Sequence, residues 1–521
     1  MAQRHSYDAI IIGVGTNGLV TAAYLAREGL DVIVLERRHT VGGAASTEEI
    51  FPGYQVSTCS YIVHILQDKV VADLDLFGHG LELLRLDPKA FLPFPDGSKI
   101  VFHRSARKLL AEFAQFSADD AAGYQEWDAF WTRAGALMNR FFLDPDPPTV
   151  GELVATAADS DTGELLDRLI HGSVAGLLDD TFTSDQAKTA ALLPLIAPMK
   201  SLDDKGTLLS AAATQAARFT SHVGLPVGGM GAVSQAMSRS AEAAGAHIRT
   251  GADVRRILVD DARAAGVELA DGQQLRAGAV LSNAHPKITF EKLLEPGAVP
   301  PSALDSVRAM TTDSASMKFH AIVSELPDFT RWLGDGDSRA LAQFYICPSV
   351  DYFRAVVDSS AAGELPGQPV LAVQIPTIYD RTLTAMDGHH IVSAAIRHMP
   401  AKPRGSSWAE SRAEMARRVI ALLTEYAPNF ERSVLDWVLY TPDDLEARLG
   451  MVDGMVHHLT HAPSQLLGDR GFGRGGYRTP VAGLYLCGPG AHPGGEVSGA
   501  PGHNAAAVVI ADLRAGQAPG R

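Results

Sequence analysis

The chain has 521 residues, with 45 basic and 60 acidic side chains and a formal net charge of −15. This length is enough for two or more domains with a substantial core. The acidic balance argues against a nucleic-acid groove as the main binding surface, so nucleic acid is not an expected partner. The charge does not exclude a membrane surface, because a local basic or apolar patch is enough for peripheral contact.

Three cysteines are spread along the chain, at Cys59, Cys347 and Cys487. A sparse, odd set predicts free thiols in a reducing compartment, and no pair has the spacing of a metal site. The first residues lead straight into an apolar run, without the apolar core of a secretory leader. The most apolar internal stretch, 190–198, is too short to span a bilayer. We therefore expect a cytoplasmic protein without a bound metal, and leave peripheral membrane association open.

The first elements expected along the chain form one compact unit. An apolar, β-branched run at 7–12 predicts a buried parallel strand. It leads into the pattern G-x-G-x-x-G at 13–18, and apolar spacing predicts a helix from 19 that ends at Gly29. A second strand is expected at 31–36 and ends on an acid. This order of elements is typical of a dinucleotide-binding unit.

Each residue type in this unit has a physical role. Gly13 permits the tight turn, Gly15 lets the backbone approach a pyrophosphate at the helix N-terminus, and Gly18 lets helix and strand pack closely. Glu36 can accept hydrogen bonds from a ribose diol. The alternative is a glycine turn in an ordinary α/β unit, but every part falls within roughly 30 residues, as expected of the motif. The residues expected to contact the dinucleotide here are Gly13, Val14, Gly15, Thr16, Asn17, Gly18, Glu36 and Arg37.

A second glycine pair, Gly42 and Gly43, begins six residues after the acid. Segment 36–46 resembles the E-x-x-x-x-x-G-G segment of the FAD-dependent amine oxidase and phytoene desaturase superfamily, which favours FAD over NAD. The resemblance implies that the backbone through Ala44 and Ala45 passes under the pyrophosphate and ribitol. A surface turn is the alternative, and it leaves the spacing from the acid unexplained.

The middle of the chain alternates between helical and strand patterns. Residues 105–170 have helical spacing, interrupted by a proline-rich boundary at 144–148. A helix that opens at 228–231 and ends near 244 is followed by short strands. They are expected at 247–250, 254–260, 264–269, 274–277 and 279–282. This run resembles the β-meander in the FAD domain of the same superfamily, where the residue at Val254 would hold the adenine with its backbone. An ordinary strand residue is the alternative for Val254.

The C-terminal end is expected to form a strand, a turn rich in glycine and proline, and a helix over 483–513. A helix N-terminus near 498–501 would direct backbone N–H groups at the N1–C2=O edge of a flavin, which gains negative charge on reduction. A generic strand-to-helix connection is the alternative, but the density of Gly and Pro favours close approach to a planar ligand. The expected contacts are Gly488, Glu496, Val497 and Ser498.

The resemblance extends over nearly the whole chain. The C-terminal segment is similar to the phytoene desaturase-like flavoproteins, most of all to the branch of pyridine nucleotide-disulphide oxidoreductase domain-containing protein 2. Segments 426–430, 441–446 and 477–480 also fit that branch. Glu496 stands where we expect another glycine in this branch, which introduces an acid near the flavin.

The resemblance implies an α/β (α+β) architecture in which a Rossmann-type FAD-binding domain is interleaved with a substrate domain of mixed β-sheet and helices. The FAD-binding domain is expected from 1–70, 215–290 and 470–521. The substrate domain is expected from 71–214 and 291–469.

Four side chains are candidates for proton transfer. His64, His492 and His503 lie in segments expected near the flavin, and imidazole is the side chain best suited to move a proton near neutral pH. A hydrogen-bonded structural histidine is the alternative for each. Lys318 lies in the alternating segment 315–323, which predicts a strand. By resemblance to the amine oxidases, in which a lysine on the corresponding strand reaches flavin N5 through a water, we place Lys318 near N5; a lysine facing solvent is the alternative.

These features favour an FAD-dependent oxidoreductase, whether dehydrogenase, desaturase or oxidase. It would bind FAD non-covalently and transfer a hydride to flavin N5 from a small apolar organic substrate. Isoprenoid and carotenoid-like compounds belong to this substrate class. Oxygen or a quinone would accept the electrons, because the chain has one credible dinucleotide loop and no C-x-x-C pair. Two alternatives are a redox-neutral, flavin-dependent polyene isomerase and a flavin-binding interaction protein without robust catalysis. The oligomeric state is left open.

Overall fold

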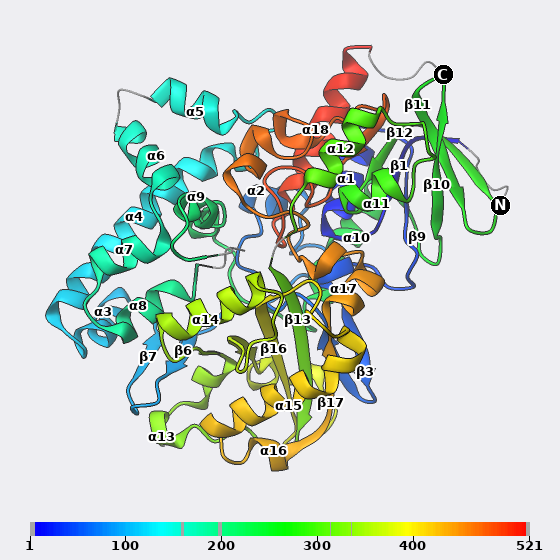
Figure 1. Ribbon diagram of the computed structural model, residues 1–521. Helices are drawn as coiled ribbons and strands as arrows, with labels where there is room; N and C mark the ends of the chain where they lie inside the picture. The colour runs from blue at the N-terminus through cyan, green and yellow to red at the C-terminus, as the bar shows by residue number, and fades with distance from the viewer. Residues whose placement is uncertain (1–5, 158–160, 196–200, 313, 335, 517–521) are drawn as a thin grey trace.

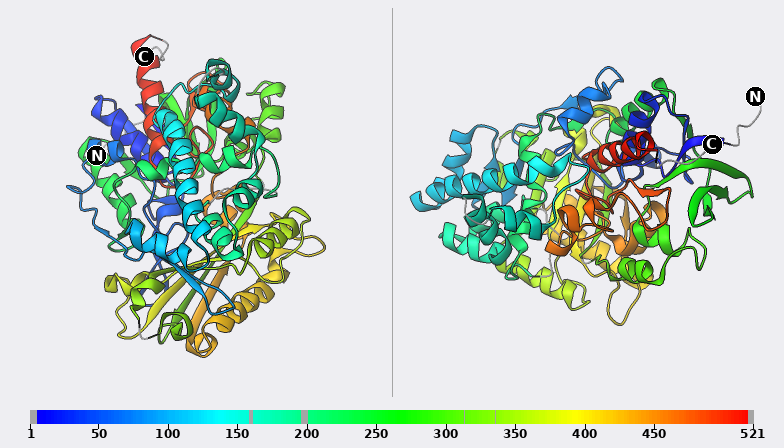
Figure 2. Two further views of the ribbon diagram at one scale, coloured as in Figure 1. Left: turned by 90° about the vertical axis from the view of Figure 1, so that its left-hand side faces the viewer. Right: turned by 90° about the horizontal axis from the view of Figure 1, so that it is seen from above.

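The computed structural model describes residues 6–157, 161–195, 201–312, 314–334 and 336–516 (Figure 1). Two seven-stranded sheets organise this part of the chain, and helices cover them (Figures 1 and 2). The expected architecture, a Rossmann-type unit combined with a second mixed sheet and helices, is confirmed. The domain boundaries themselves stay a prediction.

The first sheet joins strands from both ends and the middle of the chain. Its order is β10 (Val254–Asp260), β11 (Arg263–Leu269), β12 (Gln274–Ser282), β1 (Ser6–Ile12), β2 (Val32–Leu35) and β9 (His247–Arg249), and β18 (Leu484–Leu486) also pairs with β12. Strands β18, β12, β1, β2 and β9 are parallel, whereas β10, β11 and the start of β12 form an antiparallel meander.

One strand prediction in this sheet is wrong. Residues 274–277 and 279–282 form the single strand β12 and not two strands. Gly278 does not break the strand, because β12 stays paired through this stretch: its first residues pair with β11 and its later residues with β1 and β18. Pairing with β1 continues on both sides of Gly278, whereas pairing with β11 ends at Arg276.

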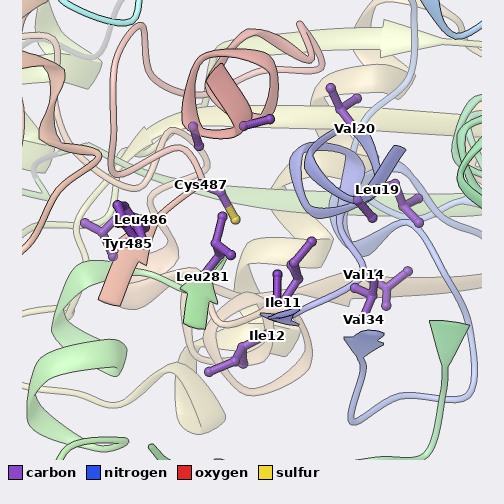
Figure 3. Packing of buried hydrophobic residues seen from close by; sticks show 14 of the residues in the cluster. Ile11, Ile12, Val14, Leu19, Val20, Val34, Leu281, Tyr485, Leu486 and Cys487 are labelled. Carbon is purple, nitrogen blue, oxygen red and sulfur yellow. The ribbon is translucent and has the colours of Figure 1, made fainter. Parts of the chain in front are cut away.

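Helices α1 (Thr16–Arg27), α10 (Gly231–Ala243) and α18 (Ala500–Arg514) pack on the first sheet. Its core is aliphatic, with Ile11, Leu19 and Leu281 fully buried (Figure 3). Gly502 lies so close to α1 that a Cβ there would be 2.3 Å from the carbonyl oxygen of Asn17. The C-terminal helix thus lies directly beside the helix that follows the first glycine loop.

The second sheet has the order β17 (Val434–Tyr440), β13 (Ala315–Val323), β16 (His390–Met399), β15 (Leu371–Gln374), β14 (Gln343–Ile346), β6 (Ala90–Pro93) and β7 (Lys99–Phe102). One face is apolar and packs against α15 (Trp408–Tyr426), where Phe319 and Ile396 meet Met415. Strand β13 lies between β16 and β17 and is buried along its whole length. The side chains of its other face therefore point into the interior of the protein.

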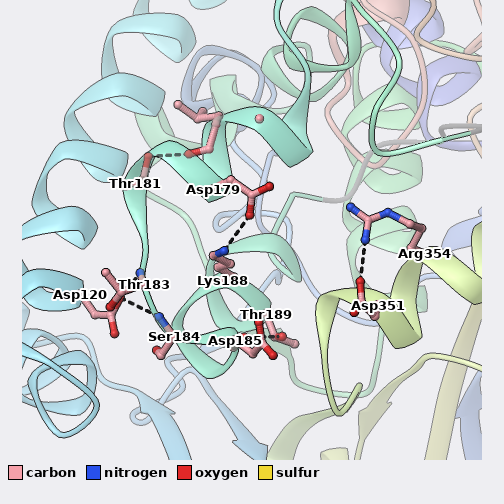
Figure 4. Close-up of polar contacts among 12 residues, drawn as sticks. Asp120, Asp179, Thr181, Thr183, Ser184, Asp185, Lys188, Thr189, Asp351 and Arg354 are labelled. Carbon is pink, nitrogen blue, oxygen red and sulfur yellow. Dashed lines mark hydrogen bonds and ion pairs between the residues drawn. The ribbon is translucent and has the colours of Figure 1, made fainter.

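A helical layer covers that other face (Figure 2). It contains α3 (Ala106–Ala114), α4 (Ala118–Phe142), α5 (Val150–Ala157), α6 (Asp161–His171), α7 (Val174–Thr181), α8 (Asp185–Leu192), α9 (Thr207–Ala212) and α14 (Val350–Ala361). Side-chain caps fix several helix starts. Asp120 accepts hydrogen bonds from the backbone N–H groups of Thr183 and Ser184, which joins α4 to the start of α8 (Figure 4).

Shorter elements complete the fold. The remaining α-helices of the described chain are α2 (Asp68–Asp73), α11 (Pro286–Glu291), α12 (Pro301–Ala309), α13 (Thr330–Leu333), α16 (Phe430–Ser433) and α17 (Pro442–Leu449). Two small sheets pair β3 (Thr47–Phe51) with β4 (Tyr54–Ser57) and β5 (Leu83–Leu84) with β8 (Leu225–Pro226). In the described ranges, no helix combines the length and the apolar character that crossing a membrane requires.

Candidate functional site

A cavity of about 770 Å³ extends from the glycine loop of the first sheet to the inner face of the second sheet. Ile12 and Leu35, at the carboxyl ends of β1 and β2, line one end, and Lys318 and Ala395 line the other. The carboxyl ends of parallel strands are where open α/β sheets bind ligands. The cavity therefore joins a nucleotide-binding end to a second chamber.

Three glycines shape the nucleotide-binding end. Gly15 caps α1 without a side-chain hydrogen bond, so the first N–H groups of the helix are open to an anion. Gly42 forms a β-bridge with Gly15, and a Cβ on Gly43 would lie 3.3 Å from the Cα of Gly15. The backbones thus approach each other closely and leave a cradle that side chains would fill. The open N–H groups and the lack of side chains suit the close approach of a pyrophosphate.

Glu36 stands beside the cradle and is only 9% exposed. Its Oε2 accepts a hydrogen bond of 3.0 Å from the N–H of Val14, and its Oε1 accepts one of 2.9 Å from the N–H of Arg38. These donors orient the carboxylate, and each of its oxygens keeps acceptor capacity. Glu36 can therefore accept further hydrogen bonds from a ligand in the cradle, and its contact with a ribose stays a prediction.

The C-terminal turn supplies the opposite wall, where Glu496 and Val497 line the cavity. Glu496 adopts a left-handed backbone conformation with φ of 73°, which is uncommon for a residue with a side chain. Its Oε2 lies 2.6 Å from Nε2 of His64 and its Oε1 lies 3.2 Å from Nε2 of His457. The acid that replaces the expected glycine is thus held between two imidazoles.

This contact changes the proton affinity of both partners. Burial of Glu496 opposes its ionisation, but His64 and His457 outweigh burial and hold the Glu496 pKa well below its usual range. Burial also disfavours the charged form of His64, yet the adjacent carboxylate raises the His64 pKa above its ordinary value. A charged His64–Glu496 pair is therefore favoured in the folded protein.

Lys318 lines the second chamber and is 7% exposed. Its Nζ is 4.4 Å from the centroid of the Tyr61 ring, and burial lowers the Lys318 pKa to about 8. Cys59 and Arg397 line the same chamber. The lysine thus faces the cavity, whereas a lysine on an edge strand would face solvent.

The expected cofactor contacts divide into two groups. Twelve of the expected cofactor contacts line the cavity: Gly13, Gly15, Thr16, Asn17, Glu36, Arg37, Gly42, Gly43, Ala44, Val254, Glu496 and Val497. Five lie behind this lining or beside it: Val14, Gly18, Ala45, Gly488 and Ser498. Gly18 supports the loop, because a Cβ there would lie 2.2 Å from the carbonyl oxygen of Gly13. Their roles toward a cofactor stay predictions.

The two C-terminal histidines lie elsewhere. His492 Nε2 is 2.8 Å from the carbonyl oxygen of Phe141, and His503 Nδ1 is 2.8 Å from Oδ1 of Asn504. Neither is among the described residues that line the cavity, in contrast to His64. The structure therefore brings Lys318 and His64 to one chamber and places His492 and His503 in hydrogen-bonded positions apart from it. Their catalytic roles stay predictions.

Three residues that line the cavity belong to no recognisable sequence motif. Asn283, directly after β12, donates a hydrogen bond of 3.2 Å from Nδ2 to the carbonyl oxygen of Gly13 and supports the glycine loop. His457 follows a short turn in the loop after α17, and Arg397 lies near the end of β16. Alternation along 390–399 could have predicted that Arg397 and Ala395 share a face of a strand. It could not have predicted which cavity that face lines.

The charged His64–Glu496 pair predicts a pH-dependent contribution to stability. Because the pKa of Glu496 is lowered in the folded protein, its stabilising contribution is fully present above the unfolded pKa of about 4.3 and is lost as pH falls through the folded pKa. Because the pKa of His64 is raised, its contribution is fully present below the unfolded pKa of about 6.5 and is lost as pH rises through the folded pKa. We expect the difference in free energy of unfolding between wild type and Glu496→Gln to be largest between these values and to shrink in alkali. Urea denaturation across a pH series measures it.

The matched control for this prediction is Glu414→Gln, because Glu414 pairs with Arg417 and Arg418 along α15 and contacts no histidine of the described chain. A Glu496→Gln difference that stays constant from acid to alkaline pH would show that the pair with His64 does not set this contribution.

Comparisons with known proteins agree with the geometry. A family described as flavin containing amine oxidoreductase matches residues 18–402. Pyridine nucleotide-disulfide oxidoreductase domain-containing protein 2 of Mus musculus is 35% identical, over 98% of this chain and 94% of its own length. A component of the limonene dehydrogenase of Castellaniella defragrans is 25% identical (98% and 96%). A phytoene desaturase of Cereibacter sphaeroides that forms neurosporene is 26% identical (97% and 94%).

Solved structures agree on the fold. A putrescine oxidase bound to putrescine superposes with a TM-score of 0.60 at 16% sequence identity, over 98% of this chain and 100% of the other. Cyclohexylamine oxidase from Brevibacterium oxydans gives a TM-score of 0.54 at 15% identity, over 98% and 99%. At these identities the likeness is one of fold alone.

Proposed function

Because the chain belongs to the family of flavin-containing amine oxidoreductases, we propose that it binds one FAD non-covalently and oxidises a small, largely apolar organic substrate. One observation carries the proposal: a single cavity joins the glycine cradle beside Glu36 to a chamber that contains Lys318 and His64. A flavin bound there would supply two-electron redox chemistry next to side chains that can move a proton.

The residues of the cradle fit FAD. Gly15, Gly42 and Gly43 would hold the pyrophosphate, Glu36 the ribose, and Val254 the adenine through its backbone. The turn at Glu496 and Val497, ahead of α18, would meet the flavin ring. The dipole of α18 favours negative charge at its N-terminus, where the reduced ring gains charge.

The cysteines support non-covalent binding. Cys59 lines the cavity and Cys487 is fully buried near it. Burial raises the Cys59 pKa and raises the Cys487 pKa to about 12, so both remain neutral thiols at physiological pH. A neutral thiol is a poor nucleophile, which disfavours attachment to the flavin.

The names of the relatives support the substrate class. Limonene and phytoene, which two relatives are named for, are apolar hydrocarbons. The second chamber has apolar walls that include Leu193, Leu195 and Phe353. We therefore propose an apolar, isoprenoid-like portion in the substrate.

A redox-neutral isomerase is the second candidate function. It is favoured by a prolycopene isomerase of an Oncidium hybrid cultivar, 25% identical over 75% of this chain and 64% of its own length. The two functions are separable by experiment. Bleaching of the bound flavin by substrate under anaerobic conditions supports oxidation, whereas turnover that needs reduced flavin without net electron transfer supports isomerisation. No turnover with candidate substrates of either kind would leave a flavin-binding interaction protein.

The first experiment identifies the cofactor. Denaturation of the purified protein followed by mass spectrometry of the released molecules should yield FAD and any bound lipid-like compound. Release of NADP in place of FAD would overturn the proposal.

We predict that pyridine nucleotides are not the routine electron partner. The cysteines of the described chain are buried free thiols, so the site offers no redox disulfide of the kind that disulfide reductases use. In stopped flow, NADH and NADPH should reduce the bound flavin no faster than buffer alone, and oxygen or a quinone should reoxidise reduced flavin. Rapid reduction by either nucleotide would contradict this prediction.

A further inference from the structure

The second sheet presents a polar face to the cavity. Register places Lys318 opposite Ala395, Ala395 opposite Ala372, and Ala372 opposite Tyr345, in one row across four strands. The two alanines leave a trough between the lysine and the tyrosine. Arg397 lies two residues along β16 from Ala395, and all five residues line the cavity. The floor of the second chamber is therefore polar, which an entirely apolar substrate does not require.

Arg397 is the unsatisfied member of this floor. In the described parts of the chain, no hydrogen bond or ion pair engages its guanidinium, which carries five donors in a planar fork. Burial disfavours its charge, and Glu496 is the carboxylate that favours it most. Both oxygens of Glu496, however, already contact His64 and His457. Arg397 is half-buried, and a guanidinium partly withdrawn from water without a direct partner is costly unless a ligand supplies one.

Positively charged side chains outnumber carboxylates along the second chamber. Lys89 and Arg104 line the cavity together with Lys318 and Arg397, and Lys89 is exposed to solvent. The carboxylates among the described lining residues are Glu36, Asp253 and Glu496, of which the first two lie at the nucleotide end. On a chain with net charge −15, this local positive potential favours entry of an anion.

Resting on the proposed function, we infer that the substrate is an apolar chain that ends in a carboxylate, and that Arg397 binds this carboxylate. A carboxylate matches the planar fork with two parallel hydrogen bonds. Its single charge also matches one guanidinium, whereas a phosphate monoester carries about −1.5 to −2. Leu193, Leu195 and Phe353, which line the same chamber, cover the apolar part.

The test titrates the purified flavin-loaded protein with decanoate and with n-decanol, which differ in the head group alone. Isothermal calorimetry and the flavin absorbance spectrum report binding without turnover. We expect decanoate to bind at least about tenfold more tightly than decanol to wild type, as charge-assisted hydrogen bonds allow. Arg397→Gln should weaken the binding of decanoate by at least about tenfold and leave the binding of decanol unchanged. The decanoate affinity of Arg397→Lys should lie between those of wild type and Arg397→Gln. The control Arg417→Gln changes an exposed arginine on α15 and should match wild type.

Three results would overturn the inference: equal binding of decanoate and decanol to wild type, unchanged decanoate affinity in Arg397→Gln, or loss of flavin from Arg397→Gln with decanoate affinity kept. If Arg397→Gln does not fold, the inference is tested by comparing the decanoate affinities of wild type and Arg397→Lys. Wild-type protein that binds decanoate through Arg397 but contains no flavin would refute the proposed function alone, so the two failures are distinguishable.

Discussion

Gly15→Val is expected to yield a folded protein without flavin. The backbone at Gly15 has φ of −76°, which any L-residue adopts, so the change adds no backbone strain. A Cβ would lie 2.8 Å from Nδ2 of Asn283, the movable end of a side chain. The branched side chain would instead fill the cradle that Gly42 and Gly43 form with Gly15. Flavin absorbance per mole of protein should fall to background, while circular dichroism and the melting temperature show a folded protein.

The control for this change is Gly367→Val. Gly367 is exposed, and nothing lies within 4 Å of its ideal Cβ. This variant should keep the full flavin content, because the same change in size is made far from the cradle. Full flavin content in Gly15→Val would show that the pyrophosphate does not bind where we place it.

The nucleotide end could be predicted from the sequence because its signal is local. The strand, glycine loop, helix and acid lie within one stretch, and a glycine stands at position 13, where φ is 96°. The partners of Glu496 illustrate the opposite case. His64 lies 432 residues away along the chain. No local pattern connects the two residues, because they meet where the segment before α2 packs against the turn before α18, with the N–H of Gln67 bonded to the carbonyl oxygen of Ser498.

The second chamber was less predictable for a related reason. Strand alternation indicated that Lys318 faces away from Met317 and Phe319, but it could not show whether that face meets solvent or a cavity. The position of β13 between β16 and β17 decides this, and it depends on strands more than 70 residues away along the chain. The position of Arg397 in the cavity cannot be predicted locally either, because it depends on the same long-range strand pairing.

Lys318→Met should leave FAD bound and slow substrate oxidation or flavin reoxidation by at least about tenfold, a low-end value for a lost proton-transfer group. Methionine keeps the unbranched shape of the lysine side chain and removes its amine. Lys318 is buried, lines the chamber, and stacks its amine over Tyr61. The loss should therefore fall on chemistry and not on packing. Anaerobic reduction and aerobic reoxidation, each followed by flavin absorbance in stopped flow, measure the two half-reactions separately.

The pH dependence distinguishes a chemical role of Lys318 from a packing role. Burial lowers its pKa to about 8, so the amine is mainly charged below this pH and mainly neutral above it. An ammonium favours electron transfer to oxygen, because negative charge develops there, so this effect lowers the reoxidation rate as pH rises through about 8. A neutral amine accepts a proton, so an effect on substrate oxidation raises its rate over the same range. Whichever half-reaction Lys318 governs should show this inflection in wild type and lose it in Lys318→Met.

Lys69→Met is the matched control, because Lys69 forms an exposed pair with Asp73 on the surface of α2. It removes the same amine at a position where a surface ion pair contributes little, so both half-reactions should keep wild-type rates and pH profiles. Wild-type kinetics in Lys318→Met, or an inflection near pH 8 that survives the change, would assign Lys318 a structural role on the chamber floor.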